Sequence, residues 1–367
     1  MWIQSLLITV LFTVFTPIAE AQIFMVGGPN PTHQTIQNAL DDLPQESEHE
    51  RLVLLFEANY AEKLIIDKPK VRFIGAGPAP SVIHYDAYAG QSIPGTNQTW
   101  GTWRSATVTV RATDVSFENI NIENRFNYPY FDSLPEGHPE RIKGMQAVAL
   151  MLDQGSDRFT FSNGEIHGFQ DTLFVLSGRS VFTDSIISGH VDFIFGAGTA
   201  LFLRNEIVTR NRTKPMSTIG YLTAPSTHIE TPYGLVFWNN KLTREPSVKA
   251  DSMGLGRPWH PTTTFDDGRY ANPFAIGQAV FLANWMDKHI KTEPWFPMGG
   301  TAKDGSRIEF QPEDARFYEW ESCGPGSAIN TTRRQLDPGI EQLFKPSLIL
   351  GDWKPRVDIS IAAHCPR

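Results

Sequence analysis

The chain has 367 residues, of which 41% are apolar and 11% aromatic, so it is long enough to bury a large core. Its formal net charge is -8 and it has no basic cluster, which excludes nucleic-acid binding through a positive surface. An anionic substrate would therefore have to be held by a few local cations.

The first residues have the pattern of a secretory signal. An apolar run from Leu6 to Phe15 is followed by Pro17 and by the small-x-small sequence Ala19-Glu20-Ala21. The run is shorter than a transmembrane helix requires, and no other stretch approaches that length, so no membrane association is expected. We expect a signal peptide over residues 1–21 and a secreted, extracellular single domain over residues 22–367.

A short helix and then many β-prone runs follow. Thr35–Leu43 has apolar residues at helical spacing and ends before Pro44, which predicts a short helix that caps the N-terminal end of the domain. From Arg51 onward, β-prone segments are broken by Asn, Asp and Gly, without extended helical periodicity. The segments expected to form strands include Leu52–Phe56, Val71–Ile74, Thr107–Val110, Val115–Ile122, Val148–Leu152 and Phe159–Ser162.

In this region an apolar residue recurs two positions before an Asn or Asp anchor. The gaps between successive anchors fit a unit of about 22 residues that is sometimes enlarged by a loop, which is typical of a parallel β-helix. The anchors could form a hydrogen-bonded ladder from coil to coil. The alternative is a β-sandwich or barrel, which would show hairpin turns between alternating strands. The anchors are Asn119, Asn163, Asp184, Asn205, Asn240 and Asn284.

Two acids occupy equivalent places in consecutive repeats. Asp171 lies eight residues after Asn163, and Asp192 lies eight residues after Asp184. The equal offsets predict that the two carboxylates stack on one face of the β-helix, with neighbouring strands about 4.8 Å apart. As structural alternatives, Asp171 could cap the backbone amides of a turn, and Asp192 could belong to the anchor ladder.

A stacked pair of carboxylates is suited to acid–base and nucleophilic chemistry. The two cannot both ionise easily, so one stays anionic as a nucleophile or base and the other stays protonated as an acid. If Asn127–Gly144 is an insertion in one coil, Gln146 falls near the same column. Gln146 and Gln170 could then donate hydrogen bonds to an oxyanion.

The loop Gly254–Trp259 could complete such a site. Arg257 could orient the anionic carboxylate, and Trp259 offers a flat face for a sugar ring. Alternatively, Arg257 is a solvated surface charge and Trp259 packs on the β-helix. The ten histidines show no paired ligand spacing and the two cysteines are distant, so no metal site is expected. The absence of a Gly-x-Ser-x-Gly sequence argues against a serine esterase.

These residues resemble the pectin methylesterase family over most of the chain, from about Arg51 to Trp353. Three stretches are similar to that family's motifs, in the same order: Gly168-Phe169-Gln170-Asp171-Thr172-Leu173, Val191-Asp192-Phe193-Ile194-Phe195-Gly196 and Leu255-Gly256-Arg257-Pro258-Trp259. The resemblance implies a right-handed parallel β-helix whose long loops form a substrate cleft, and a monomer that removes methyl groups from the C6 esters of pectin (homogalacturonan).

The resemblance also implies a role for each site residue. Asp192 would be the nucleophile, Asp171 the acid and then the base, and Arg257 the group that holds Asp192. Gln146 and Gln170 would stabilise the oxyanion, and no metal or organic cofactor is expected. The residues expected to contact the sugar chain are Thr107, Gln146, Arg257, Trp259 and Phe195.

Two covalent features are also predicted. Cys323 and Cys365 could form one disulfide in an exported chain, which would stabilise the fold by about 4 kcal/mol if it is unstrained. Three Asn-x-Thr sequences make Asn97, Asn211 and Asn330 candidate glycosylation sites.

Three alternative functions use the same residues differently. A polygalacturonase-like glycosidase would also employ paired acids on a β-helix. An esterase or thioesterase for a small acyl substrate would be separated by a panel of methylated pectin against acyl thioesters. A non-catalytic carbohydrate-binding β-helix would have lost the reaction, although the retention of both acids with Gln146, Gln170 and Arg257 argues against it.

Overall fold

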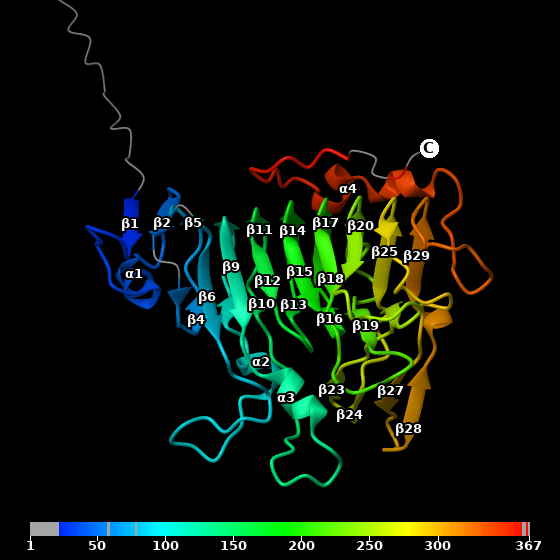
Figure 1. Cartoon of the computed structure of the whole chain (residues 1–367). Helices are drawn as coiled ribbons and strands as arrows, with labels where there is room; N and C mark the ends of the chain where they lie inside the picture. The colour runs from blue at the N-terminus through cyan, green and yellow to red at the C-terminus, as the bar shows by residue number, and fades with distance from the viewer. Residues whose placement is uncertain (1–21, 57–58, 78, 362–364, 366–367) are drawn as a thin grey trace, which may run out of the picture.

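The structure is a computed structural model that describes residues 22–56, 59–77, 79–361 and 365. The predicted signal peptide lies outside the described residues. Figure 1 shows strands stacked coil upon coil, in chain order from the N-terminal to the C-terminal end. Three parallel sheets run along this stack, which confirms the predicted all-β parallel β-helix. Within the described ranges, no helix is long and apolar enough to cross a membrane.

The longest sheet has ten strands, one from nearly every coil. Its strands, in stack order, are β1 (Gln22–Val26), β2 (Arg51–Leu55), β5 (Val71–Gly75), β8 (Ser116–Glu118), β11 (Phe159–Ser162), β14 (Arg179–Thr183), β17 (Thr199–Leu203), β20 (Leu235–Trp238), β25 (Gln278–Leu282) and β29 (Arg316–Trp320).

Two further parallel sheets complete each coil. The seven-stranded sheet contains β22 (Met253–Gly256), β19 (Gly220–Pro225), β16 (Val191–Gly196), β13 (Leu173–Val175), β10 (Leu150–Leu152), β7 (Val108–Val110) and β4 (Leu64–Ile66). The eight-stranded sheet contains β26 (Trp285–Met286), β21 (Lys241–Arg244), β18 (Glu206–Thr209), β15 (Ile186–Gly189), β12 (Glu165–His167), β9 (Ile120–Asn124), β6 (Ser81–Tyr85) and β3 (Asn59–Tyr60).

Helices and hairpins lie outside the three sheets. Two antiparallel hairpins project from the C-terminal half: β23 (Thr262–Phe265) with β24 (Gly268–Ala271), and β27 (Met298–Thr301) with β28 (Arg307–Phe310). The helices are α1 (Ile36–Asp42), α2 (Gly101–Arg104), α3 (Tyr128–Ser133) and α4 (Pro346–Leu350), with 3-10 turns η1 (Pro312–Asp314) and η2 (Ile340–Phe344).

Helix α1 confirms the predicted N-terminal cap. The Thr35 hydroxyl accepts a hydrogen bond from the backbone N–H of Asn38, which starts the helix as an N-cap. Ile36, Ala39 and Leu40 are buried in the main core, on the face that the helical spacing predicts.

Stacked phenylalanines fill the inside of the coils. The rings of Phe202 and Phe237 stack with centroids 4.5 Å apart, as do those of Phe237 and Phe281. These rings come from the same register position of neighbouring strands of the ten-stranded sheet. All three side chains are fully buried, so the parallel register stacks equivalent side chains into one continuous core.

The predicted ladder exists, but the six anchors occupy two neighbouring positions of the repeat. Strand pairing aligns Phe161, Phe182 and Phe202 at one position of the repeat. The anchor lies two residues after the phenylalanine in the earlier coils and three residues after it in the later coils. Asn119, Asn163 and Asp184 adopt a left-handed conformation at a coil corner, where short polar residues are tolerated. The later anchors form the buried ladder instead: Asn205 donates to Asn240, which donates to Asn284.

One segment expected as a single strand is two. Val115–Ile122 contains β8 and the start of β9, which belong to different sheets. The break is at Asn119, whose φ of 56° turns the chain at the corner. The apolar residues on both sides of Asn119 hide this corner in the sequence pattern, because both strands point apolar residues inward.

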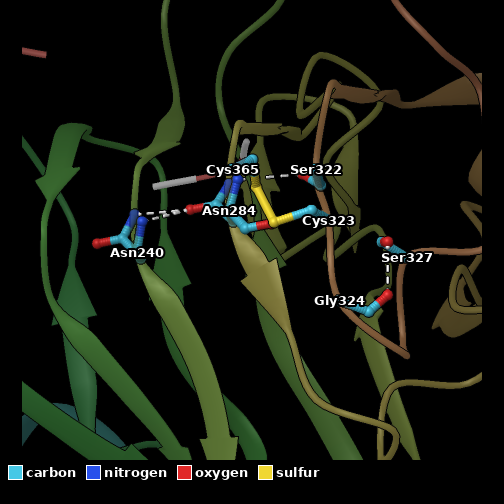
Figure 2. Close-up of a disulfide and its surroundings, with 7 residues drawn as sticks. All are labelled: Asn240, Asn284, Ser322, Cys323, Gly324, Ser327 and Cys365. Carbon is cyan, nitrogen blue, oxygen red and sulfur yellow. Dashed lines mark hydrogen bonds between the residues drawn. A yellow bond between two sulfur atoms is a disulfide. The ribbon is translucent and has the colours of Figure 1, made fainter. Parts of the chain in front are cut away.

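The C-terminal segment runs back over the outer face of the ten-stranded sheet (Figure 1). It contacts both halves of the stack: Asp352 pairs with Arg179 at 2.6 Å, and Arg356 pairs with Glu50 at 2.6 Å. Its final described residue, Cys365, forms the predicted disulfide with Cys323, beside the Asn ladder (Figure 2).

Replacing both Cys323 and Cys365 with Ser is expected to lower the free energy of unfolding by about 4 kcal/mol. The disulfide joins positions 42 residues apart, and without it the unfolded chain gains the entropy of that loop. Denaturant unfolding of the variant and of the reduced wild type, each compared with the oxidised wild type, measures the loss. An unchanged unfolding midpoint in both samples would show that the disulfide contributes nothing to stability.

Candidate active site

The two acids lie level with each other in adjacent coils. Asp171 lies two residues before β13, and Asp192 lies in β16, the next strand of the seven-stranded sheet. The register pairs Leu173 with Ile194, the residues two positions after each acid. In addition, the backbone N–H of Asp171 donates to the carbonyl of Val191 at 3.0 Å. The column expected from the equal offsets is therefore present in the backbone.

Both acids have unusual backbone conformations. Their φ angles are 64° for Asp171 and 49° for Asp192, in the left-handed region. The pairing of β16 with β19 is also irregular between Val191 and Ile194, as in a β-bulge. Such irregularities re-aim a side chain that regular pleating would point elsewhere, and they are frequent beside active sites.

Arg257 holds the Asp192 carboxylate with two hydrogen bonds. Its Nε donates to Oδ1 at 2.8 Å and its Nη2 donates to Oδ2 at 2.5 Å. The guanidinium carbon lies 4.2 Å from the ring centre of Tyr221, and the backbone N–H of Arg257 donates to the Thr223 carbonyl. This bidentate pair fixes the orientation of Asp192.

The two acids differ in how their charge is compensated. Burial raises the pKa of Asp171 well above its ordinary value, and the neighbouring Asp192 charge raises it further. Burial also raises the pKa of Asp192, but the hydrogen bonds and the positive charge of Arg257 oppose that rise. Asp171 is therefore the member that keeps its proton longer, and Asp192 is the member that ionises first.

Of the other polar residues predicted for the site, Gln170 contacts an acid, whereas Gln146 and Thr107 lie in other environments. The Gln170 side chain donates a hydrogen bond to Asp171, which opposes the rise of the carboxyl pKa. Gln146 is half-buried, and the strand register puts Val148 level with Asp171, so Gln146 lies two residues before the column. Thr107 is fully buried, and its hydroxyl donates to the Glu123 carbonyl at 2.9 Å.

An aromatic surface adjoins the acids. Phe174, three residues after Asp171, stacks on Phe195 with ring centroids 4.2 Å apart. Trp259 lies 5.6 Å from Phe195. Trp103, on α2, contacts Phe174 edge-on at 5.0 Å and is 45% exposed, so it offers the open part of this surface.

The loop around α3 lies beside the segment that precedes Asp171, because the ring of Tyr128 stacks on that of Phe169 at 5.8 Å. Tyr128, on α3, is buried, and burial raises its pKa to about 12, with Asp171 adding to the rise. Asp132, on the same helix, pairs with Arg212 at 2.5 Å, and both side chains are largely buried. This ion pair ties the loop around α3 to the segment that follows β18.

Sequence reasoning did not identify Trp103, Tyr128 or Tyr221 as part of this region. The only signal for Trp103 is a bulky apolar residue in a short polar-flanked helix, and its partner Phe174 is far away in the sequence. Of the sequons, Asn97 is exposed, whereas Asn330 is half-buried and its amide donates to the Thr292 carbonyl. Asn211 is also half-buried.

Comparisons of this chain with family models, protein sequences and solved structures all match pectinesterases. The family model described as pectinesterase matches residues 27–339. Pectinesterase A of Dickeya chrysanthemi is 44% identical over 327 residues, which cover 88% of each chain. Among solved structures, the pectin methylesterase PemA from Erwinia chrysanthemi has a TM-score of 0.87 and 42% identity, covering 93% of this chain and 100% of that one.

A second solved structure, the pectin methylesterase from Yersinia enterocolitica, has a TM-score of 0.83 and 42% identity, covering 88% of this chain and 99% of that one. A pectin methylesterase solved in complex with a hexasaccharide has a TM-score of 0.87 and 42% identity, with 93% and 100% coverage.

Proposed function

Because the chain belongs to the pectinesterase family, it is a carboxylic ester hydrolase that acts on pectin, and we propose that Asp192 and Asp171 carry out the hydrolysis of its C6 methyl esters. The products are methanol and a galacturonate carboxylate. Nearly buried acids that ionise unequally, Asp192 before Asp171, are suited to nucleophilic attack paired with proton donation.

In the first half of the reaction, a carboxylate oxygen of Asp192 attacks the carbonyl carbon of the ester. The carbonyl oxygen becomes an oxyanion, to which the Gln170 and Gln146 amides donate hydrogen bonds. When the intermediate collapses, the bond to the methoxy oxygen breaks and Asp171 gives that oxygen its proton. Methanol leaves, and the sugar is bound to Asp192 as an anhydride.

In the second half, Asp171 is a carboxylate and takes a proton from water. The water oxygen attacks the carbonyl carbon of the anhydride, and the bond to Asp192 breaks. Asp192 leaves as a carboxylate, which Arg257 stabilises through its two N–H groups. Asp171 is protonated again and the new galacturonic acid releases its own proton to solvent, so both acids return to their starting states.

The observation that carries this proposal is the asymmetry of the pair. Arg257 donates its two hydrogen bonds, at 2.8 and 2.5 Å, to Asp192 and not to Asp171. Burial and the neighbouring charge of Asp192 raise the pKa of Asp171. The exposed ring of Trp103 and the half-buried ring of Trp259, which both pack against the buried Phe174, support a flat sugar ring as the group that lies beside the acids.

The test of this function is product analysis on methyl-esterified homogalacturonan. Wild type is expected to release methanol without creating new reducing ends, because the ester and not the glycosidic bond is cleaved. New reducing ends without methanol would indicate a glycosidase. Faster hydrolysis of small acyl esters or acyl thioesters than of pectin would indicate a different ester substrate, and the absence of all these products would contradict catalysis.

Export and a monomeric state stay predictions. The disulfide between Cys323 and Cys365 supports an oxidising environment, in agreement with the predicted signal peptide. Homogalacturonan as the bound polysaccharide is supported by the relative solved with a hexasaccharide.

A further inference from the structure

An arginine outside the acid pair contacts the segment that carries Gln170 and Asp171. This residue, Arg210, directly follows β18. Its Nη1 donates a hydrogen bond to the carbonyl of Gly168 at 3.1 Å, and its guanidinium carbon lies 3.7 Å from the ring centre of Phe169. Arg210 therefore contacts two consecutive residues of the turn between β12 and β13, through the backbone of one and the side chain of the other.

The Arg210 side chain is itself held in place. Its Nε donates to one carboxylate oxygen of Glu245 at 3.3 Å, and the other oxygen of that carboxylate accepts the backbone N–H of Asn211 at 2.8 Å. The backbone N–H of Arg210 donates to the carbonyl of Gly189 at 2.8 Å. The arginine thus has a fixed backbone and a carboxylate partner, and its planar fork is directed at the turn before Gln170.

Phe169 connects this arginine to the proposed oxyanion donor and to the acid. Gln170 directly follows Phe169, and its side chain donates a hydrogen bond to Asp171. The backbone carbonyl of Phe169 accepts the N–H of His190 at 2.9 Å, and its ring stacks on that of Tyr128 with centroids 5.8 Å apart. A shift of Phe169 would change the direction of the Gln170 amide, and a misplacement of about 1 Å in a reacting site can cost about 100-fold in rate.

These contacts contribute more to orientation than to stability. The Arg210 and Glu245 side chains are 28% and 39% exposed, and an ion pair with that exposure stabilises a fold little. The backbone of the turn is already held by hydrogen bonds between coils, such as the one from the N–H of Asp171 to the carbonyl of Val191. What Arg210 adds is a restraint on the direction in which the residues of the turn point.

We propose that Arg210 is a positioning residue for the ester hydrolysis, which acts through Gly168 and Phe169 to hold the Gln170 amide in its donating direction. In the proposed function, on which this inference rests, Gln170 stabilises the oxyanion and Asp171 gives its proton to methanol. Arg210 forms no bond to the ester in this role. It therefore affects the rate of the chemical step and not the binding of the polysaccharide.

The test compares Arg210→Met with Arg204→Met. Arg204 also binds a carboxylate, that of Asp184, and donates to a backbone carbonyl, that of Ser360. It follows β17 in the ten-stranded sheet, whereas the acids belong to coils of the seven-stranded sheet. Methanol release from methylated pectin gives kcat and KM, and thermal unfolding gives the folded fraction of each variant. We expect Arg210→Met to lower kcat by about tenfold with KM changed by less than about twofold, and Arg204→Met to keep the wild-type kcat.

Two further variants separate positioning from a loss of charge or of fold. Arg210→Lys keeps a cation over the ring but lacks the fork that reaches both Glu245 and Gly168, so it should fold and recover part of kcat. Phe169→Leu removes the ring through which Arg210 acts. The double variant Arg210→Met with Phe169→Leu should therefore lose much less kcat than the product of the two single losses.

Three results would each overturn this role of Arg210: a wild-type kcat in folded Arg210→Met, a loss confined to KM, or single losses that multiply in the double variant. An equal loss of kcat in Arg204→Met would also contradict it, because that arginine does not contact the turn before Gln170. The proposed function is tested separately by Asp192→Asn. If Asp192→Asn lost turnover while Arg210→Met kept it, only the positioning role would be wrong.

Discussion

Replacing Asp192 with Asn is expected to lower turnover on methylated pectin by at least about 10,000-fold, because the amide has no anionic oxygen to attack the ester. The fold should be retained. Asn tolerates the left-handed conformation in which Asp192 is held at a φ of 49°, and its oxygen can still accept a hydrogen bond from Arg257. Methanol release, with circular dichroism as the check of folding, measures the two effects separately.

Asp184→Asn is the matched control for this experiment. Asp184 is also left-handed, with a φ of 52°, and an arginine, Arg204, binds both of its carboxylate oxygens at 2.8 and 2.7 Å. It lies at a coil corner away from the acid pair, so the control should keep wild-type turnover. A folded Asp192→Asn variant with near-normal methanol release would rule out Asp192 as the nucleophile.

Replacing Asp171 with Asn is expected to slow turnover by about 100-fold to 10,000-fold, the usual contribution of a positioned acid–base group. A remnant is expected because methanol is a small leaving group that water can protonate. The pH profile should change as well. Wild type should lose activity as pH rises through the raised pKa of Asp171, when the acid loses its proton, and the variant should lack this alkaline limb. Both proteins should lose activity toward acid pH, as Asp192 is protonated.

The same substitution is expected to stabilise the protein at neutral pH. Since the folded pKa of Asp171 is raised above its ordinary value of 3.8, wild type is most stable below that value and loses stability as pH rises through the folded pKa. Asn cannot ionise and avoids this loss, so its Tm should exceed that of wild type at neutral pH and match it at acid pH. An unaltered alkaline limb, or normal turnover, would exclude Asp171 as the acid.

Much of the fold can be predicted from the sequence because each coil repeats the same requirements. A corner needs a short polar residue in a left-handed conformation, and the ladder needs a buried amide. These two positions are neighbours, so an Asn in the sequence does not reveal which one it occupies. Asn163 and Asn205 look equivalent in the pattern, yet Asn163 is at the corner and Asn205 is in the ladder.

The acid pair could be predicted for a related reason. Asp171 and Asp192 belong to consecutive coils without an insertion between them, so their offsets from the corners are equal. Gln146 precedes the column by two residues because the insertion before it changes the local count. Contacts such as Trp103 with Phe174 join coils separated by long loops, and no local pattern encodes the conformation of those loops.

The C-terminal segment has a consequence for how this molecule loses its structure. A stack in which each coil touches only its neighbours could melt progressively from either end, with intermediates of many lengths. Here, the C-terminal segment forms ion pairs with Glu50 at one end of the stack and with Arg179 in the middle, and a disulfide with Cys323 near the other end. Unfolding of the terminal coils must therefore break contacts of a segment that also contacts the middle coils. This coupling favours one cooperative unfolding transition over progressive unfolding from the ends.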